Sequence, residues 1–508
     1  MKKRILLLLM VVGIGIQPFA QPRPTPQQRA WHDMEFYLFM HFGPNTFTNL
    51  EWGKGTEQPE LFDPVNLDCN QWCRIAKASG ATGIIITAKH HDGFCLWPSK
   101  YSTHTVRESK WKNGKGDVLK ELSQACKRYG LKFGVYLSPW DRNHPKYGTD
   151  EYNDVFVNML KEIFANYGPI WELWWDGANG EGPNGKKQVY DFRRYENLIR
   201  KLSPRTIIFS DIGPDIRWCG NESGIAGETN WNRLDTAGFK RGAGGPPQNT
   251  LNTGNVRGKL WIPAECDVSI RPGWFYHQEE DKEVKTPELL FDLYLKSVGR
   301  GANLLLNVPP DRRGLITKYD SAALVEFKKL KDKSFAVNKA LHATFMCCCI
   351  EPCTSSMNAV DGNPVSSIVL GDLPCKNILR FKQAQWINTI VIKEDMLFGQ
   401  SFGDLKLILT DINDKTKEIQ LTTVGHKRII TFPAIQVKSV TLLVNSSHYF
   451  SAITEIEAYL IEERLVGEVG LTPTPLRTER ELEGWNSINE DLFDRWQSVL
   501  RHIVTKDR

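Results

Sequence analysis

Short apolar runs alternate with amphipathic stretches over roughly the first 330 residues. The apolar runs have the length and the β-branched and aromatic content of buried strands, and they occupy 36–42, 83–88, 132–137, 172–175, 206–211, 260–264 and 303–308. Helical periodicity predicts helices over 70–78, 117–128, 151–167, 191–201, 287–298 and 320–331. No Gly-x-Gly-x-x-Gly turn follows a strand, so we expect one irregular (β/α)8 TIM-like barrel within 21–335 rather than two doubly wound domains.

The pattern changes after residue 335. Helical periodicity fades, and short alternating runs separated by Asp, Asn and Gly turns predict an all-β sandwich over 336–463. Tryptophan follows the same division, since 13 of the 16 tryptophans lie between Trp31 and Trp274 and the sandwich segment contains only Trp386. The remainder, 464–508, is predicted to be a charged tail with a helix around 492–503.

The first twenty residues have the order of a secretory signal peptide. Lys2, Lys3 and Arg4 precede an apolar run over 5–16, and Ala20 follows at the expected cleavage point. We therefore expect export to the periplasm or the medium. The run is shorter than the roughly 20 residues that cross a bilayer, so no membrane insertion is expected.

Charge and cysteine content exclude some classes of function. Lys and Arg number 64 against 59 Asp and Glu, and this formal excess of +5 is too small to indicate a nucleic-acid partner. The eleven cysteines form no evenly spaced framework. The cluster Cys347 to Cys349 with Cys353 lacks separated CxxC pairs, so we expect buried free thiols there rather than a metal site.

Polar and aromatic clusters follow several of the predicted strands. In a barrel the carboxyl ends of all strands meet at one face, where active sites form. We therefore expect one site built from His41-Phe42-Gly43, Lys89 to Gly93, Tyr136 to Asp141, Trp174 to Gly177, and Asp211.

Asp176 ends an aromatic strand and is followed by Gly177. A carboxylate in this position can attack the anomeric carbon of a sugar, although a helix cap or a structural loop Asp would have the same sequence. The many tryptophans favour a sugar site, because aromatic faces stack on the C–H faces of sugar rings. A second carboxylate would be needed, and spacing alone does not choose among Asp211, Glu222, Glu228 and Glu265.

His90 and His91 offer a competing interpretation. With Asp92 and His41 they could be ligands of a metal in a metal-dependent hydrolase. Adjacent histidines on an extended strand point to opposite sides, which disfavours a shared ion. Hydrogen bonds to substrate hydroxyls, or a structural role, are the alternatives.

Four stretches together resemble the α-L-fucosidases of glycoside hydrolase family 29. They are His41-Phe42-Gly43 followed by Glu51-Trp52-Gly53, then Thr87 to Phe94, Gly134-Val135-Tyr136, and Trp174-Trp175-Asp176-Gly177. They occur in the family's order within residues 30 to about 330. The resemblance implies a barrel enzyme that hydrolyses terminal α-linked fucose with retention of configuration.

The resemblance also implies roles for individual residues. Asp176 matches the nucleophile, and Glu222 in Gly220-Asn221-Glu222 matches the acid/base of the subgroup that acts on α-1,3 and α-1,4 branches. The stretch from Glu265 to Phe275 is similar to that subgroup as well. The acid/base position varies across the family, which leaves Glu265 as the second candidate. Retention requires the two carboxyl groups to lie about 5 Å apart.

By the same matching, a set of residues would bind substrate. It comprises His41, Glu51, Trp52, His90, His91, Tyr136, Trp174 and Trp274. The implied partners are fucosylated oligosaccharides or glycoconjugates, with no metal and no organic cofactor. The β-rich segment is similar to the discoidin-like, galactose-binding-like modules of such enzymes, and we expect it to brace the barrel. The alternative to an enzyme is a secreted glycan-binding protein on a barrel that no longer catalyses.

Overall fold

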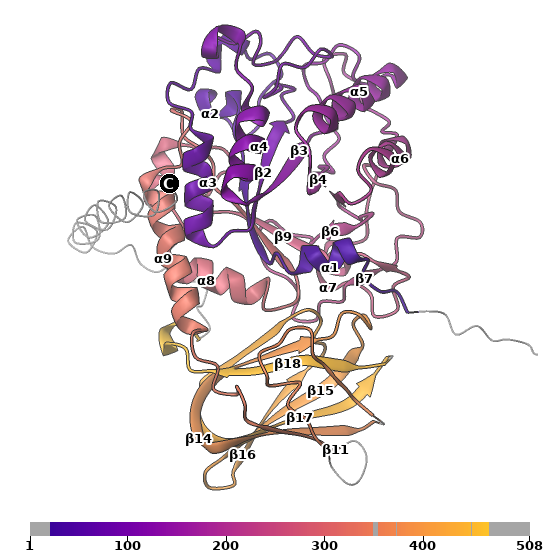
Figure 1. The fold of residues 1–508 in the computed structure, drawn as a ribbon. Coiled ribbons are helices and arrows are strands. Elements are labelled where there is room, and N and C mark those ends of the chain that lie inside the picture. The colour runs from indigo at the N-terminus through magenta and orange to yellow at the C-terminus, as the bar shows by residue number, and fades with distance from the viewer. Residues whose placement is uncertain (1–20, 349–353, 372, 449, 467–508) are drawn as a thin grey trace, which may run out of the picture.

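A computed structural model describes residues 21–348, 354–371, 373–448 and 450–466. The expected signal peptide, the tail beyond residue 466, Cys349 and Cys353 lie outside the described residues. Two bodies follow one another along the chain, a barrel and an antiparallel β domain below it (Figure 1). No helix among the described residues has the length and apolar content needed to span a membrane.

Eight parallel strands close into the predicted barrel, in the order β1-β10-β9-β6-β5-β4-β3-β2. They are β1 (Phe36–Met40), β2 (Gly83–Lys89), β3 (Lys132–Leu137), β4 (Glu172–Trp174), β5 (Ile207–Ser210), β6 (Ile216–Trp218), β9 (Ala264–Ser269) and β10 (Asn303–Asn307). Every residue of β1 and β2 is buried, as expected for strands that are covered on both faces.

Helices surround the barrel on the outside (Figure 1). The longer ones are α3 (Cys69–Ser79), α4 (Val118–Tyr129), α5 (Asp150–Asn166), α6 (Phe192–Leu202), α8 (Pro287–Lys296) and α9 (Lys318–Ser334). The short elements are α1 (Pro26–His32), α2 (Pro44–Thr48), α7 (Gln248–Thr253), η1 (Pro59–Leu61), η2 (Trp111–Gly114), η3 (Gln278–Lys282) and η4 (Glu463–Leu465). Several helices begin at a side-chain cap: Asp117 accepts from the Lys120 N–H and Thr317 from the Asp320 N–H.

The barrel is irregular between β5 and β9, and here one strand prediction is wrong. Residues 260–264 do not form a barrel strand: β8 (Leu260–Trp261) pairs antiparallel with β7 (Arg233–Leu234), and the barrel strand β9 starts only at Ala264. Pro263 separates the two, because proline lacks the N–H that a continuous ladder requires. The three-residue strand β6 was missed, since it is too short to show a period. No helix separates β5 from β6.

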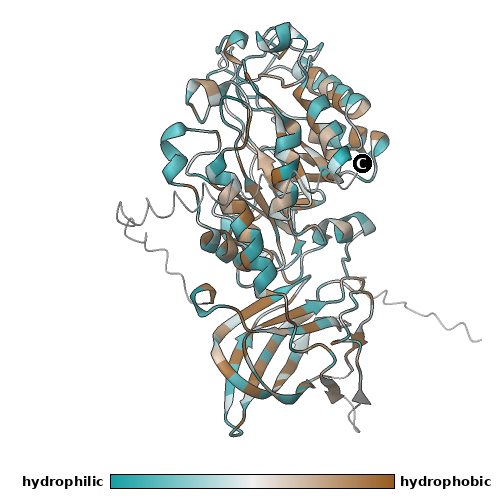
Figure 2. Ribbon diagram, turned by 60° about the vertical axis from the view of Figure 1, so that its left-hand side comes forward, coloured by the Kyte–Doolittle hydropathy of each residue, from teal (hydrophilic) through white to brown (hydrophobic). Residues whose placement is uncertain are grey.

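The second body is one antiparallel sheet of eight strands. They are β11 (Thr344–Cys348), β12 (Thr354–Ser355), β13 (Ile368–Val369), β14 (Cys375–Glu394), β15 (Phe402–Asp411), β16 (Thr416–Leu421), β17 (Arg428–Ser447) and β18 (Ala452–Tyr459). Apolar and polar residues alternate along these strands, and Figure 2 shows this as bands of two colours. Register shifts interrupt the β14–β17 ladder, and inward-facing residues from several strands form a core separate from that of the barrel.

The cysteine prediction is partly wrong. Cys347 is buried in β11, but Cys348 is disulfide-bonded rather than a free thiol, and Cys375 in β14 is disulfide-bonded as well. Local spacing does not reveal this, because the antiparallel pairing of β11 with β14 brings together cysteines that are distant in sequence, such as Cys347 and Cys375, whose sulfurs are 3.9 Å apart.

The two bodies meet through directed contacts. Lys427 forms an ion pair with Glu35 at the start of β1, and the Asn232 N–H donates to the Gln400 side chain at 2.7 Å. The buried ring of His32, at the end of α1, stacks on His426 with centroids 5.1 Å apart.

Acid is expected to weaken this junction. Burial lowers the pKa of His426 to about 4 and that of His32 well below its usual value. The unfolded chain, with histidine pKa values near 6.5, then binds more protons, so stability is lost as the pH falls from about 6.5 to 4. For His426 alone the loss corresponds to about 3 kcal/mol of unfolding free energy. His426→Phe keeps a ring against His32. Between pH 7 and pH 4, the unfolding free energy of this variant, measured with urea, should fall by about 3 kcal/mol less than that of the natural chain. An equal fall in both proteins would contradict the assignment of this pH dependence to His426.

Candidate active site

The predicted site residues gather at the carboxyl end of the barrel. Strand ends or following loops supply them: β1 supplies His41, Glu51 and Trp52, β2 supplies His90 and His91, β3 supplies Tyr136, β4 supplies Trp174 and Asp176, β6 supplies Glu222, and β9 supplies Trp274. Hydrogen bonds and ring contacts link these side chains. Parallel strands bring loops that are distant in sequence to one rim.

Asp176 is held by two hydrogen bonds. Its Oδ2 accepts from the Tyr136 hydroxyl at 3.0 Å, and its Oδ1 accepts from the Ala178 N–H at 2.7 Å. Burial and the neighbouring Asp176 raise the pKa of Tyr136 well above its usual value, so the phenol remains a donor. About a quarter of the Asp176 side chain (26%) is exposed, which leaves the carboxylate accessible from the barrel mouth.

Gly177 permits the tight exit after Asp176. A Cβ at this position would lie 2.1 Å from Oδ2 of Asp211, so any other residue would displace the Asp211 side chain. Asp211 is thus beside the nucleophile candidate, and burial together with Asp176 raises its pKa to about 6.

Hydrogen bonds place a proton on Nδ1 of His91, and burial keeps the ring neutral. The Ser138 hydroxyl donates to the Trp140 carbonyl at 2.8 Å, so its oxygen accepts from Nδ1 of His91 at 2.8 Å. Burial lowers the pKa of His91 to about 4, which leaves Nε2 as an unprotonated acceptor. This Nε2 lies 3.8 Å from Oδ2 of Asp176.

His41 and His90 are neutral for the same physical reason. Burial lowers the pKa of His41 to about 3 and that of His90 well below its usual value. His41 Nδ1 donates to Oδ1 of Asn307 at 2.8 Å, which leaves Nε2 as an acceptor. Sequence reasoning missed Asn307 and Ser138, although both end or follow a barrel strand.

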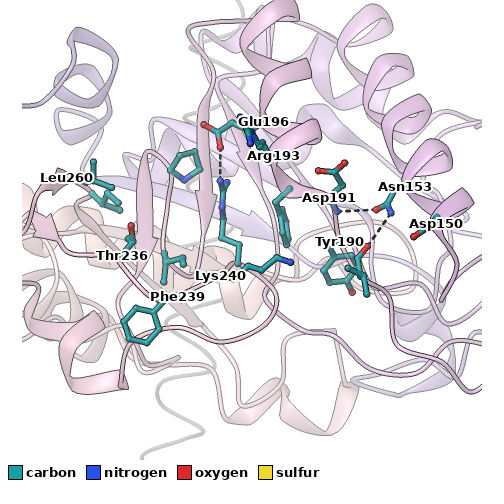
Figure 3. Close-up of a pocket in the computed structure, with 16 residues that line it drawn as sticks. Asp150, Asn153, Tyr190, Asp191, Arg193, Glu196, Thr236, Phe239, Lys240 and Leu260 are labelled. Carbon is teal, nitrogen blue, oxygen red and sulfur yellow. Dashed lines mark hydrogen bonds and ion pairs between the residues drawn. The ribbon is translucent and has the colours of Figure 1, made fainter.

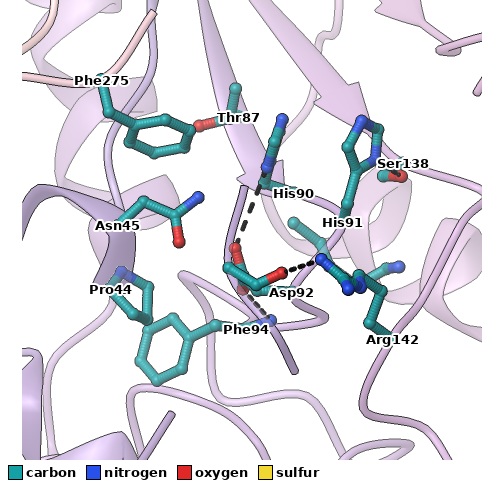
Figure 4. A network of polar contacts seen from close by, with 12 residues as sticks. Pro44, Asn45, Thr87, His90, His91, Asp92, Phe94, Ser138, Arg142 and Phe275 are labelled. Atoms are coloured by element: carbon teal, nitrogen blue, oxygen red, sulfur yellow. Dashed lines mark hydrogen bonds and ion pairs between the residues drawn. The ribbon is translucent and has the colours of Figure 1, made fainter. Parts of the chain in front are cut away.

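The expected orientation of His90 and His91 is wrong. Strand β2 ends at Lys89, so the pair lies in the turn beyond it, and the ring centroids are only 4.1 Å apart. Asp92 faces this turn, with Oδ2 3.9 Å from Nδ1 of His90 and Oδ1 accepting from the Phe94 N–H (Figure 4). Within the described part of the chain, no three His, Cys, Asp or Glu side chains are arranged to hold a metal ion.

Aromatic rings form the wall of the site. Trp174 stacks between Tyr136 and Phe209, with centroid distances of 5.2 and 4.0 Å. The ring centroids of Trp274 and His41 are 5.1 Å apart. Trp52 is 57% exposed and touches His91 edge-on at 5.6 Å, so its free face is open to solvent. Such surfaces suit the apolar faces of a sugar ring.

Glu222 and Glu265 have contrasting environments. Glu222 is exposed, and its Oε2 accepts from Nε1 of Trp274 at 3.2 Å. Its loop turns at Gly220 and Gly224, whose φ angles of 84° and 74° favour glycine. Glu265 is fully buried at the second residue of β9.

The Glu265 carboxylate is committed to the barrel interior. It accepts from Nε1 of Trp174 at 2.8 Å and from the Tyr37 hydroxyl, and burial raises its pKa. Glu228 lies elsewhere, because its carboxylate is 3.6 Å from Arg300 near the junction. Asp211 faces Gly177 beside Asp176 and Glu222 bonds to Trp274, whereas Glu265 contacts Trp174 from within the barrel.

A cavity of about 850 Å³ lies away from these residues. Residues from α6, the β5–β6 connection and the segment 236–241 line it, on the side where no helix follows β5 (Figure 3). The ion pair between Arg241 and Glu196, at 2.6 Å, forms part of its wall.

Comparisons with known proteins identify the family of the chain. A family model described as Alpha-L-fucosidase matches residues 18–330. Alpha-L-fucosidase 1 of Arabidopsis thaliana is 40% identical over 449 residues, which cover 86% of this chain and 88% of the plant protein.

Solved structures show the same architecture. The crystal structure of SpGH29 has a TM-score of 0.82 at 35% identity, and the match covers 87% of this chain and 99% of that one. A Ruminococcus gnavus GH29 fucosidase solved in complex with fucose has a TM-score of 0.80 at 28% identity, covering 88% and 96%. The chain therefore belongs to the α-L-fucosidases of glycoside hydrolase family 29.

Proposed function

We propose that this α-L-fucosidase releases terminal α-1,3- or α-1,4-linked fucose from branched glycans, with Asp176 as nucleophile and Glu222 as acid/base. The observation that carries the proposal is the rim geometry. One carboxylate is anchored by Tyr136 inside the mouth, and the other is presented by a glycine-bracketed loop and bonded to Trp274. The linkage preference rests on the likeness of Gly220-Asn221-Glu222 and of the stretch from Glu265 to Phe275 to one subgroup.

The reaction proceeds by double displacement, the general mechanism of the family. Asp176 attacks C1 of fucose as Glu222 donates its proton to the departing glycosidic oxygen, giving a fucosyl ester and a free sugar hydroxyl. Glu222, now ionised, takes a proton from water. The resulting hydroxide attacks C1, breaks the ester and regenerates both side chains.

Neutral histidines would bind the sugar hydroxyls. The free Nε2 atoms of His41 and His91 accept hydrogen bonds, and the Trp174 and Trp274 rings provide apolar wall. A sugar that lacks one hydroxyl leaves a buried acceptor unpaired, which a hydrogen-bonding site rejects by as much as about 10⁴-fold. This chemistry supports selection for fucose.

Fucose release from 3-fucosyllactose and 2′-fucosyllactose, assayed side by side, tests the linkage. We expect release from the 3-linked sugar and little from the 2′-linked one. Release from both would retain the fucosidase and reject the linkage preference. Release from neither, with fucose still bound, would favour the glycan-binding alternative, and loss of activity on chelation would favour a metal-dependent hydrolase.

We also propose that the chain is exported and that its β domain braces the barrel. Export rests on the leader-like order of the first twenty residues. Bracing is supported by the junction contacts of Lys427 and Gln400. Protease protection of the tagged chain in intact cells, compared with osmotically shocked cells, tests the export.

A further inference from the structure

His277 bridges two residues of the β1 loop. Its Nε2 lies 2.6 Å from Oε1 of Glu51, and its Nδ1 lies 2.9 Å from Oδ1 of Asn49. The imidazole is buried, with 7% of His277 exposed. The β9 loop, which carries His277, is thereby joined to the β1 loop.

The hydrogen bonds require a proton on each nitrogen of His277. The amide nitrogen of Asn49 donates to Glu279 at 2.8 Å, so the amide oxygen faces the imidazole as an acceptor. Glu51 is a carboxylate and also accepts. An imidazole that donates on both sides is a cation, so Glu51 and His277 form a charged pair.

Glu51 transmits this pairing to the loop that carries Trp274. Its Oε2 accepts from the Trp274 N–H at 2.7 Å, and its Oε1 accepts from the Phe275 N–H at 3.1 Å. Close packing surrounds the carboxylate, because a Cβ on Gly273 would lie 2.6 Å from Oε1 of Glu51. The Trp274 indole then donates to Glu222 at 3.2 Å.

We propose that His277 is a positioning residue whose bridge between Asn49 and Glu51 holds the Trp274 loop, and with it the indole donor that orients Glu222. The inference rests on the proposed role of Glu222. Loss of the imidazole removes both bridges. The Trp274 indole then shifts away from Glu222.

Other charged groups surround the His277 imidazole. Glu279, Glu280 and Asp281 lie on the same element, and Glu280 accepts from the Gly273 N–H. The Arg271 guanidinium donates to the His277 carbonyl at 3.4 Å. Arg312, in the segment after β10, interacts electrostatically with Glu279.

Leaving-group dependence tests the proposal. His277→Ala should lower kcat/KM on 3-fucosyllactose by about 10²-fold, the effect of misplacing a reacting group by an ångström, but by less than about tenfold on an activated aryl fucoside. The aryl group departs without a proton from Glu222, whereas the sugar needs one. His277→Gln keeps an uncharged donor toward Glu51 and should recover part of the loss.

Asn49 offers a matched comparison, since it accepts from His277 on the side away from Glu51. Asn49→Gly removes one of the two bridges and should lower kcat/KM on 3-fucosyllactose by less than His277→Ala does, with the same dependence on the leaving group. Glycine retains the left-handed conformation of this position, where φ is 59°. Thermal unfolding of each variant reports folding separately.

Two outcomes would overturn the proposal. One is an equal loss on both substrates in the His277 variants, which indicates a purely structural role. The other is an Asn49→Gly variant whose kcat/KM equals that of the natural chain on both substrates. If Glu222→Ala itself shows no dependence on the leaving group, the proposed role of Glu222 fails instead, so the two failures are distinguishable.

Discussion

Replacing Asp176 by alanine is expected to lower kcat by about 10⁴-fold or more on every fucoside, because no covalent intermediate can form. The side chain accepts from Tyr136 and from the Ala178 N–H, so its loss leaves two donors but no nucleophile. Azide should restore turnover by entering the space of the carboxylate, and it should give the fucosyl azide of inverted configuration. Steady-state kinetics and NMR of the product measure both effects.

Asp211→Asn is the matched control for Asp176→Ala. Asp211 lies beside Gly177 and shares the rim but is not the proposed nucleophile. Its variant should retain most of the activity and give no inverted azide product. Calorimetry should show that Asp176→Ala still binds fucose. Unchanged turnover in Asp176→Ala would show that another residue is the nucleophile.

Replacing Glu222 by alanine is expected to separate substrates by their leaving groups. Cleavage of 3-fucosyllactose should fall by about 10³-fold, the contribution of a general acid, while formation of the fucosyl enzyme from an activated aryl fucoside should fall far less. Glu222 is exposed and bonded to Trp274, so its removal opens a path for a small nucleophile. Azide should then give the product of retained configuration.

Glu265→Gln is the comparison for Glu222→Ala. Glutamine has the shape of the protonated acid, and its single amide oxygen keeps an acceptor for either Trp174 or Tyr37, which donate to different oxygens of Glu265. Because Glu265 is fully buried within β9, we expect the variant to change thermal stability more than the leaving-group dependence. Azide rescue with retention in Glu265→Gln, and none in Glu222→Ala, would move the acid/base role to Glu265.

The barrel was predictable because its strands are buried on both faces and therefore appear as continuous apolar runs. β2 and β3 match the predicted 83–88 and 132–137 closely. The irregular part was not predictable to the same degree. β6 has three residues and includes the buried, hydrogen-bonded Arg217, so neither length nor hydropathy marks it as a strand.

Local sequence also identified the chemistry at each strand end. Asp176, His41 and His91 follow apolar runs, and the rule that active sites form at the carboxyl ends of barrel strands places them at one rim. Conformational needs of the backbone are local too, as at Gly220 and Gly224, whose φ angles are positive.

By itself, then, the sequence determined the barrel, the β domain and which residues lie at the rim, because periodicity and strand-end position are local properties. Only the tertiary structure decided what each carboxylate contacts. Glu265 is buried beneath Trp174, Glu228 faces Arg300 at the junction, and Glu51 is bonded to the Trp274 loop and His277. These partners lie far apart in sequence, and their distances depend on how the barrel closes and its loops fold over one another, which no local pattern encodes.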